Sequence, residues 1–237
     1  MMNILFFFTS FRQLQENKYQ VDILNHQLSN LDKNNINVDI ILHNNNSNYN
    51  NEIIKDSFNV DKLTNITCIN KIEIIHTNKN TGYLWGASEA LTDNFFKFKG
   101  YDYVIHLNTD VYICNMNELM QYLLDNLNNE YIFFVNNFRK NAGFKTDFTI
   151  FKPTNNVYLN YTNHNKYTIN RDIPEDFLKY SIINQNIKYK ILPDIFFPIH
   201  CTTIIVDHEQ LKQRKIYHVH ELKNMDTIIE HLLSTNK

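Results

Sequence analysis

The sequence predicts an α/β fold in which a mostly parallel central sheet is flanked by helices. In the first half of the chain, short apolar runs alternate with segments whose apolar residues recur every three to four positions, a pattern typical of strands that alternate with helices. The apolar runs are nearly unbroken, as expected for parallel strands that are buried on both faces. After residue 135 the alternation ends, so a mixed second half is expected.

The elements of the first half follow from these two patterns. Residues 4–9 form an unbroken apolar run, and residues 17–31 follow with Val21, Leu24 and Leu28 at helical spacing. The same patterns predict, in order, a strand over 36–42, a weaker helix over 50–63, a strand over 71–76, a helix over 81–98 and a strand over 103–107. The first half therefore has the order βαβαβαβ.

The elements of the second half are predicted partly from turn and cap signals. Helical spacing resumes over 116–127, and an apolar strand follows over 131–135. Beyond it we expect a short strand over 147–153 stopped by a proline, a helix over 174–183 that begins at a proline, and a strand over 188–192. Neither an internal repeat nor a linker divides the sequence, so we expect a single domain over residues 1–237.

Composition excludes some classes of function. A net charge of -2 without a long basic run disfavours nucleic acid as a partner. The widely spaced Cys68, Cys114 and Cys201 form no paired motif, which indicates reduced thiols. The apolar run over 4–8 is too short for a membrane span and lacks the flanks of a signal peptide, so we expect a cytoplasmic protein without a membrane span.

The most informative motif is Asn108-Thr109-Asp110, directly after the predicted strand over 103–107. A carboxylate just beyond a parallel strand lies at the carboxyl edge of the sheet, where open α/β folds bind nucleotides. The motif is a variant of Asp-x-Asp, a spacing that can hold the divalent cation of a diphosphate. Its first position is neutral here, and an alternative is that Asp110 only begins a turn and caps the helix near Met116.

The end of the first strand, Thr9-Ser10-Phe11-Arg12, is expected at the same edge. Two hydroxyls, a planar aromatic ring and a guanidinium suit the base and phosphate of a nucleotide. The alternative is that Ser10 caps the following helix.

A second loop is expected to face the ligand. Two of the four glycines, Gly82 and Gly86, lie with Asn80 and Trp85 between the predicted strand over 71–76 and the next helix. Glycine lets the backbone approach a ligand, and the helix N-terminus offers unpaired N–H groups to an anion or a ribose. A plain left-handed turn is the alternative.

In their order, the Thr-Ser-Phe strand end, the Asn-x-Gly-x-x-x-Gly loop and His-Leu-Asn-Thr-Asp-Val resemble the GT-A glycosyltransferases, which use sugar nucleotides and have a Rossmann-like half. The resemblance covers residues 3–115 and, more loosely, 147–175. It implies a GT-A fold with a nucleotide-sugar-binding half over about 1–115 and an acceptor-binding half over about 116–237. It also implies that Asp110, assisted by Asn108, binds Mn²⁺ or Mg²⁺ at the donor diphosphate.

Three carboxylates are candidates for the catalytic base. Glu175 and Asp176 resemble the Glu-Asp pair that opens a helix in inverting GT-A enzymes, where a carboxylate deprotonates the acceptor. Such a base is needed because a sugar hydroxyl has a very high pKa. Asp147, at the start of a predicted strand, competes for the role, and acidic residues in a first helical turn can simply complement the helix dipole. The choice among the three stays open.

His218 and His220 alternate in the manner of a strand, which places both imidazoles on one face. The resemblance implies that one of them joins the metal ligands, as a C-terminal histidine often does in GT-A enzymes. The alternative is a pair of surface or hydrogen-bonded histidines.

The expected activity is metal-assisted transfer of a sugar from a UDP-linked donor to a hydroxyl of a glycan or another acceptor. The Glu175-Asp176 pair favours inversion of the anomeric configuration, and retention stays open. Two further functions stay open. The incomplete Asp-x-Asp motif would also suit a module that binds a nucleotide sugar without turnover, and the first half would suit a different Rossmann-like transferase, such as a methyltransferase.

Overall fold

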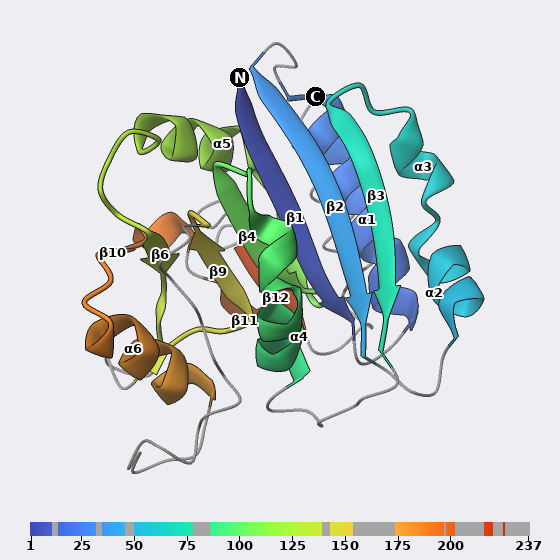
Figure 1. Cartoon of the computed structure of the whole chain (residues 1–237). Coiled ribbons are helices and arrows are strands. Elements are labelled where there is room, and N and C mark those ends of the chain that lie inside the picture. Colours follow the sequence, from blue (N-terminus) through green and yellow to red (C-terminus); the bar gives the residue numbers. More distant parts are fainter. Residues whose placement is uncertain are drawn as a thin grey trace.

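The computed structural model describes residues 1–10, 14–31, 35–45, 50–77, 86–138, 143–153, 174–196, 198–201, 216–219 and 225. Its centre is a seven-stranded sheet in the order β10-β6-β9-β4-β1-β2-β3. Helices α1 (Leu14–Ser29) and α4 (Gly86–Asn94) lie on opposite faces of this sheet (Figure 1). The prediction of a mostly parallel sheet flanked by helices is therefore confirmed.

The first half of the chain has the predicted order of elements, with one correction. Its elements are β1 (Met2–Ser10), α1, β2 (Ile36–Asn44), α2 (Asn51–Phe58), α3 (Asp61–Thr64), β3 (Ile69–His76), α4 and β4 (Tyr103–Asn108). The single helix predicted over 50–63 is wrong, because α2 ends at Phe58 and the next residue, Asn59, has a left-handed φ of 40°. Asparagine adopts this conformation more readily than most residues.

The second half is mixed, as predicted, and contains several strands that the pattern did not predict. Its elements are β5 (Val111–Ile113), α5 (Met116–Asp125), β6 (Phe133–Val135), β7 (Asn137–Phe138), β8 (Gly143–Phe144), β9 (Phe148–Phe151), α6 (Pro174–Asn184), β10 (Tyr189–Ile191), β11 (Ile199–Cys201) and β12 (Ile216–Val219). Strands β11, β12 and β5 form a second, three-stranded sheet. Among the residues that the structure describes, no helix has the length and apolarity of a membrane span.

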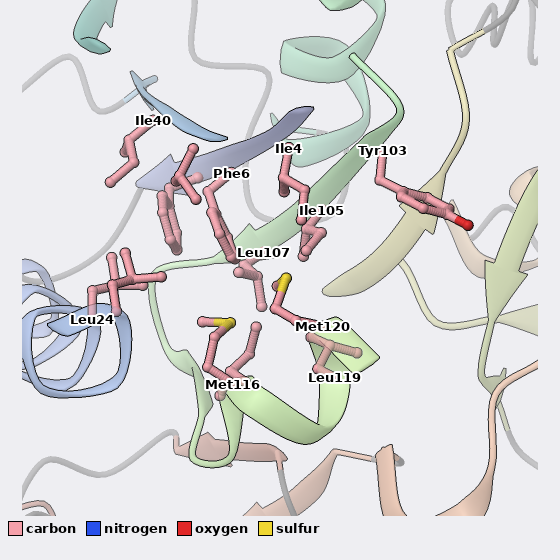
Figure 2. Packing of buried hydrophobic residues seen from close by; sticks show 14 of the residues in the cluster. Ile4, Phe6, Leu24, Ile40, Tyr103, Ile105, Leu107, Met116, Leu119 and Met120 are labelled. Carbon is pink, nitrogen blue, oxygen red and sulfur yellow. The ribbon is translucent and has the colours of Figure 1, made fainter. Parts of the chain in front are cut away.

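The central strand β1 is buried on both faces, which explains its unbroken apolar sequence. Ile4 and Phe6 pack toward α1 and α5, whereas Leu5 and Phe7 belong to a second core with α4. Figure 2 shows the first of these cores, where Leu107 of β4 lies above the methionines of α5. Each such side chain contributes about 1.5 to 3 kcal/mol when it is fully buried.

Strand β9 determines the geometry of the second half. It runs antiparallel to both of its neighbours, β4 and β6. Its beginning therefore lies beside the end of β4, and the amide of Asn108 donates a hydrogen bond to the carbonyl oxygen of Asp147 at 3.0 Å. The reversed strand thus brings residues from both halves of the chain to one edge of the sheet.

Candidate active site

The carboxyl ends of β1 and β4 form the base of the candidate site. Thr9 pairs with Asn108 in the parallel register, and the Thr109 amide donates to the Thr9 carbonyl oxygen at 3.1 Å. The Thr9 hydroxyl lies 3.1 Å from the Asn108 Oδ1 oxygen and 2.7 Å from Nε2 of His106. The predicted meeting of the two strand ends at one edge is therefore present in the structure.

The first-strand residues are held rigidly at this edge. Ser10 is buried, and its hydroxyl donates to Oδ1 of Asn17 in α1 at 3.1 Å. The carbonyl oxygen of Ser10 accepts a hydrogen bond from the amide of Asn45 at 3.2 Å. Phe11 and Arg12, the other two predicted nucleotide contacts of this strand end, lie outside the described residues.

Gly86 begins α4 at the same edge, beside the end of β2. A Cβ atom at Gly86 would lie 2.4 Å from Nδ2 of Asn45, so the start of the helix packs against the side chain of the residue that follows β2. This approach places the N-terminus of α4 near Ser10 through the shared neighbour Asn45. Of the other residues predicted for this loop, Asn80, Gly82 and Trp85 lie outside the described part of the chain.

Asp110 lies where the main sheet meets the three-stranded sheet. It is 2% exposed, and its carbonyl oxygen accepts a hydrogen bond from the amide of Val219 in β12 at 2.9 Å. His218 pairs with Val111 in the same register, so its backbone lies next to the predicted metal motif. The side chain of His218, and all of His220, lie outside the described residues.

The alternative role of Asp110 as a helix cap is wrong. Helix α5 is capped by Asn115, whose Oδ1 accepts a hydrogen bond from the Glu118 amide at 3.0 Å. The Asp110 carboxylate is therefore not used for the cap of that helix.

Two buried groups near Asp110 were not singled out from the sequence. Glu16, in the first turn of α1, is 1% exposed, and its Oε2 lies 3.5 Å from the hydroxyl of Thr109. Burial raises the pKa of Tyr112 well above its ordinary value, and the carboxylates of Glu16 and Asp110 raise it further. An acid in a first helical turn is commonly a partner of the helix dipole, so the sequence pattern did not distinguish Glu16.

The three candidate bases lie in one acidic group. Asp147 precedes β9, while Glu175 and Asp176 form the first turn of α6. Burial raises the pKa of Glu175, and the negative charges of Asp147 and Asp176 raise it further, whereas the cation of Lys145 lowers it. The structure therefore brings together all three carboxylates, which lie up to 29 residues apart in the sequence.

The acidic group is assembled by a direct backbone contact. A Cβ atom at Gly143 of β8 would lie 2.7 Å from the carbonyl carbon of Glu175 and 2.9 Å from the amide nitrogen of Asp176. Real Cβ atoms do not approach backbone this closely, so only glycine fits at this position. Gly143 thereby fixes the distance between β8 and the first turn of α6.

His106 interacts with both the end of β1 and Asp147. It is fully buried in β4, which lowers its pKa to about 3, although the negative charge of Asp147 opposes that shift. The ring is therefore neutral at pH 7, and its Nε2 lies 2.7 Å from the Thr9 hydroxyl. His106 positions Thr9, which in turn contacts Asn108.

The burial of His106 predicts a loss of stability in acid. The pKa of His106 is about 3 in the folded state and about 6.5 in the unfolded state, so unfolding takes up a proton below pH 6.5. Between pH 7 and pH 4.5 the free energy of unfolding should fall by about 2 to 3 kcal/mol through this residue alone. Urea unfolding at the two pH values measures this change in the free energy of unfolding.

A His106→Gln variant is the control, since it cannot take up the proton. Its loss of stability between pH 7 and pH 4.5 should be smaller than that of the wild type by the same amount. Part of the pH dependence will persist, because burial also lowers the pKa of His43 to about 4. Equal losses in both proteins would contradict the neutral, buried state of His106.

The residues around Asp110 fit a divalent cation in part. Asp110 offers carboxylate oxygens and Asn108 an amide oxygen at one sheet edge, and Mg²⁺ characteristically takes one or two protein carboxylates together with waters and substrate phosphates. Within the described ranges, no three His, Cys, Asp or Glu side chains are grouped as a metal would need.

Comparison with known proteins gives a match by structure alone. No family model matches the sequence, and no curated protein matches it either. Among solved structures, the bifunctional glycosyltransferase WbbM aligns with a TM-score of 0.58 at 12% identity, over 98% of this chain and 50% of that protein. The glycosyltransferase GlyE of Streptococcus pneumoniae aligns with a TM-score of 0.56 at 11% identity, over 98% of this chain and 60% of GlyE. The chain thus spans half of WbbM and somewhat more of GlyE.

A further match covers nearly the whole of the other protein. The galactosyltransferase LgtC, solved with donor and acceptor sugar analogues, aligns with a TM-score of 0.53 at 9% identity, over 98% of this chain and 96% of LgtC. At such identities the similarity concerns the fold. The chain has the fold of the GT-A glycosyltransferases.

Proposed function

We propose that the protein is a glycosyltransferase that moves a sugar from a nucleotide-diphosphate donor to a hydroxyl group of a glycan or another acceptor. The observation that carries the proposal is the meeting, at the carboxyl edge of a GT-A fold, of the Asn108-Thr109-Asp110 motif with a group of three carboxylates. The first element suits a diphosphate, and the second suits removal of a proton from the acceptor.

In this proposal the first half of the chain, about residues 1–115, binds the donor. The ends of β1 and β4 and the start of α4 lie at the edge where open α/β sheets bind nucleotides. The uracil and ribose of a UDP-linked donor would contact Thr9 to Arg12 and the loop from Asn80 to Gly86. The donor nucleotide and sugar are proposals that rest on this placement.

A Mn²⁺ or Mg²⁺ ion would be held by Asp110, with Asn108 and one of His218 and His220 as further ligands. When bound, the cation neutralises the charge that develops on the leaving diphosphate. The neutral Asn108 is positioned by the Thr9 hydroxyl at 3.1 Å, which orients its amide oxygen within the site. Asp110 is then the principal charged ligand from the motif.

The second half, about residues 116–237, would hold the acceptor. Asp147, Glu175 or Asp176 would take the proton of the acceptor hydroxyl as its oxygen bonds to the anomeric carbon and the bond from that carbon to the diphosphate breaks. Direct displacement of this kind inverts the anomeric configuration. The raised pKa of Glu175 suits a base, because a carboxylate with a higher pKa is the stronger proton acceptor.

A thermal-shift screen of sugar nucleotides, with and without Mn²⁺, tests the proposal. A ligand that binds the native state raises the apparent melting temperature, so a UDP-sugar together with Mn²⁺ should give a larger shift than either alone. The best donor is then incubated with enzyme, and release of UDP is measured with and without candidate acceptors.

Two outcomes would contradict the proposal. Tight nucleotide-sugar binding without sugar release, by both the wild type and Asn108→Asp, would favour a binding module. Metal-independent stabilisation by S-adenosylmethionine, with none by sugar nucleotides, would favour a methyltransferase.

A further inference from the structure

Lys145 is a buried cation at the centre of the acceptor side. It follows β8 and is 3% exposed. Its backbone is fixed on both sides, since its amide donates to the Asn136 carbonyl oxygen at 2.9 Å and its carbonyl oxygen accepts from the Thr149 hydroxyl at 3.0 Å. Burial of an ammonium group is costly unless negative charges compensate it. A buried lysine at this place therefore needs its acidic neighbours.

Those neighbours are the three candidate bases. The Lys145 ammonium lies 3.4 Å from Oδ2 of Asp147, and both side chains are largely buried. The charges of Lys145, Asp147 and the adjacent Asp176 all act on the pKa of Glu175. Lys145 is thus a close cation for both Asp147 and Glu175.

Among the described residues, two other titratable groups flank the acidic group. His106 of β4 is neutral, and the negative charge of Asp147 acts on it. Lys179, one turn further along α6, lies with its ammonium 5.8 Å from the ring centre of Phe144. Lys145 is consequently the cation that is shared between Asp147 and Glu175.

The three carboxylates differ in their ion pairing and in their exposure. Asp147 is ion-paired with Lys145, and Asp176 is 8% exposed. Glu175 and Asp147 are both partly exposed, but Asp147 is engaged by Lys145, so Glu175 is the member of the group that is left to meet an incoming hydroxyl. A carboxylate that is engaged by an ammonium is also a weaker proton acceptor than one that is not.

We propose that Lys145 is a positioning residue, which engages the carboxylate of Asp147 and thereby leaves Glu175 to accept the proton of the acceptor hydroxyl. This assignment rests on the proposed glycosyl transfer and deepens it, because it assigns different roles to three carboxylates of the same site. Lys145 contacts neither donor nor acceptor in this scheme. It acts through Asp147 and through its charge on Glu175.

The test compares Lys145→Met, which removes the charge at similar length, with Lys145→Arg, which keeps it. In Lys145→Met the acid limb of the pH profile of kcat should move up by about one pH unit, because a nearby cation no longer lowers the pKa of Glu175. We expect kcat at pH 7 to fall about tenfold or more, with an unchanged KM for the donor. Lys145→Arg should retain the wild-type profile.

Two further variants separate the carboxylates. Glu175→Gln should lower kcat by about a thousandfold, and Asp147→Asn should lower it far less. A loss in Asp147→Asn as large as that in Glu175→Gln would overturn the assignment. If Lys145→Met does not fold, the double variant Lys145→Met/Asp147→Asn, which removes both partners of the Lys145–Asp147 ion pair, replaces it and should retain more activity than Glu175→Gln.

A titration that needs no turnover distinguishes the possible failures. With ¹³C-labelled glutamate, the Glu175 carboxyl resonance should titrate about one pH unit higher in Lys145→Met than in the wild type. Transfer by the wild type with an unchanged pH profile in Lys145→Met would overturn the role of Lys145 and leave glycosyl transfer intact. If the wild type transfers sugar from no donor, the proposed function is contradicted, and the proposed role of Lys145 is contradicted with it.

Discussion

Replacement of Asp110 by asparagine is expected to lower metal-dependent transfer by about 10²- to 10³-fold, with little change in stability. Asparagine has the same shape as aspartate, so a side chain that is only 2% exposed keeps its packing. The hydrogen bond from Val219 reaches the backbone carbonyl of Asp110 and survives the change. What is lost is the negative charge that we propose as the principal protein ligand of the cation.

Steady-state rates at several Mn²⁺ concentrations measure the effect, and Mn²⁺ binding by electron paramagnetic resonance gives a readout that does not depend on turnover. Asp102→Asn is the matched control, because Asp102 precedes the same strand at its opposite end and its Oδ2 accepts from the Asn3 amide at 2.7 Å. It should leave both metal binding and rate near the wild-type values. Near-normal rates in Asp110→Asn would show that the metal is placed wrongly.

Asn108→Asp provides a test in the opposite direction. It completes the Asp-x-Asp motif and should tighten Mn²⁺ binding by about tenfold, since a second carboxylate adds charge at the site. The Thr9 hydroxyl, 3.1 Å from Oδ1 of Asn108, can donate equally well to a carboxylate.

The strands with long apolar runs were predictable because strands that are buried on both faces have a nearly continuous run of apolar residues in the sequence. Strands β1 and β4 carry apolar side chains on both faces, and no amphipathic pattern competes with that interpretation. The short strands β5, β7, β8 and β11 have only two or three residues each, fewer than a periodic pattern needs. Strands β5 and β11 exist through pairing with β12, which lies further along the chain, and β7 and β8 pair only with each other, so a local periodic pattern contains none of them.

The candidate site was predictable to the extent that it depends on strand ends. Thr9, Asn108 and Asp110 follow from the rule that parallel strands present their carboxyl ends at one edge. That Asp147 lies beside Asn108 depends instead on the reversal of β9, and the alternation of residues in a strand does not reveal its direction. The roles of all the candidate site residues stay predictions, and Phe11, Arg12, Asn80, Gly82, Trp85 and His220 also lie outside the described residues.

Lys145 and Gly143 were missed for a related reason. Their importance arises from contact with the first turn of α6, about 30 residues further along the chain. A single lysine near a single aspartate, or a glycine before a strand, is unremarkable in sequence. A glycine followed within a few residues by a lysine and an acid, in a chain with only four glycines, was the one available signal.

Replacement of Gly143 by alanine is expected to be the most damaging small substitution on the acceptor side. The added methyl group would lie 2.7 to 2.9 Å from backbone atoms of Glu175 and Asp176, which cannot rotate away as a side chain can. Either β8 or the first turn of α6 must move, at a cost of about 1 to 3 kcal/mol of unfolding free energy, as in other overpacked sites. Because the moved turn carries two of the three carboxylates, kcat should fall as well, by about tenfold or more.

Gly100→Ala separates this collision from ordinary backbone strain. Gly100 has a φ of 99°, which alanine tolerates poorly, but a Cβ there meets no atom within 4 Å. Gly100→Ala should therefore lower the free energy of unfolding by about 1 to 2 kcal/mol. It should not affect kcat, since Gly100 precedes β4 and lies beyond the end of that strand opposite to its carboxyl end. Urea unfolding and steady-state rates on both variants make the comparison. If Gly143→Ala lost stability with an unchanged kcat, the first turn of α6 would not belong to the catalytic machinery, because a displaced base cannot support a normal rate.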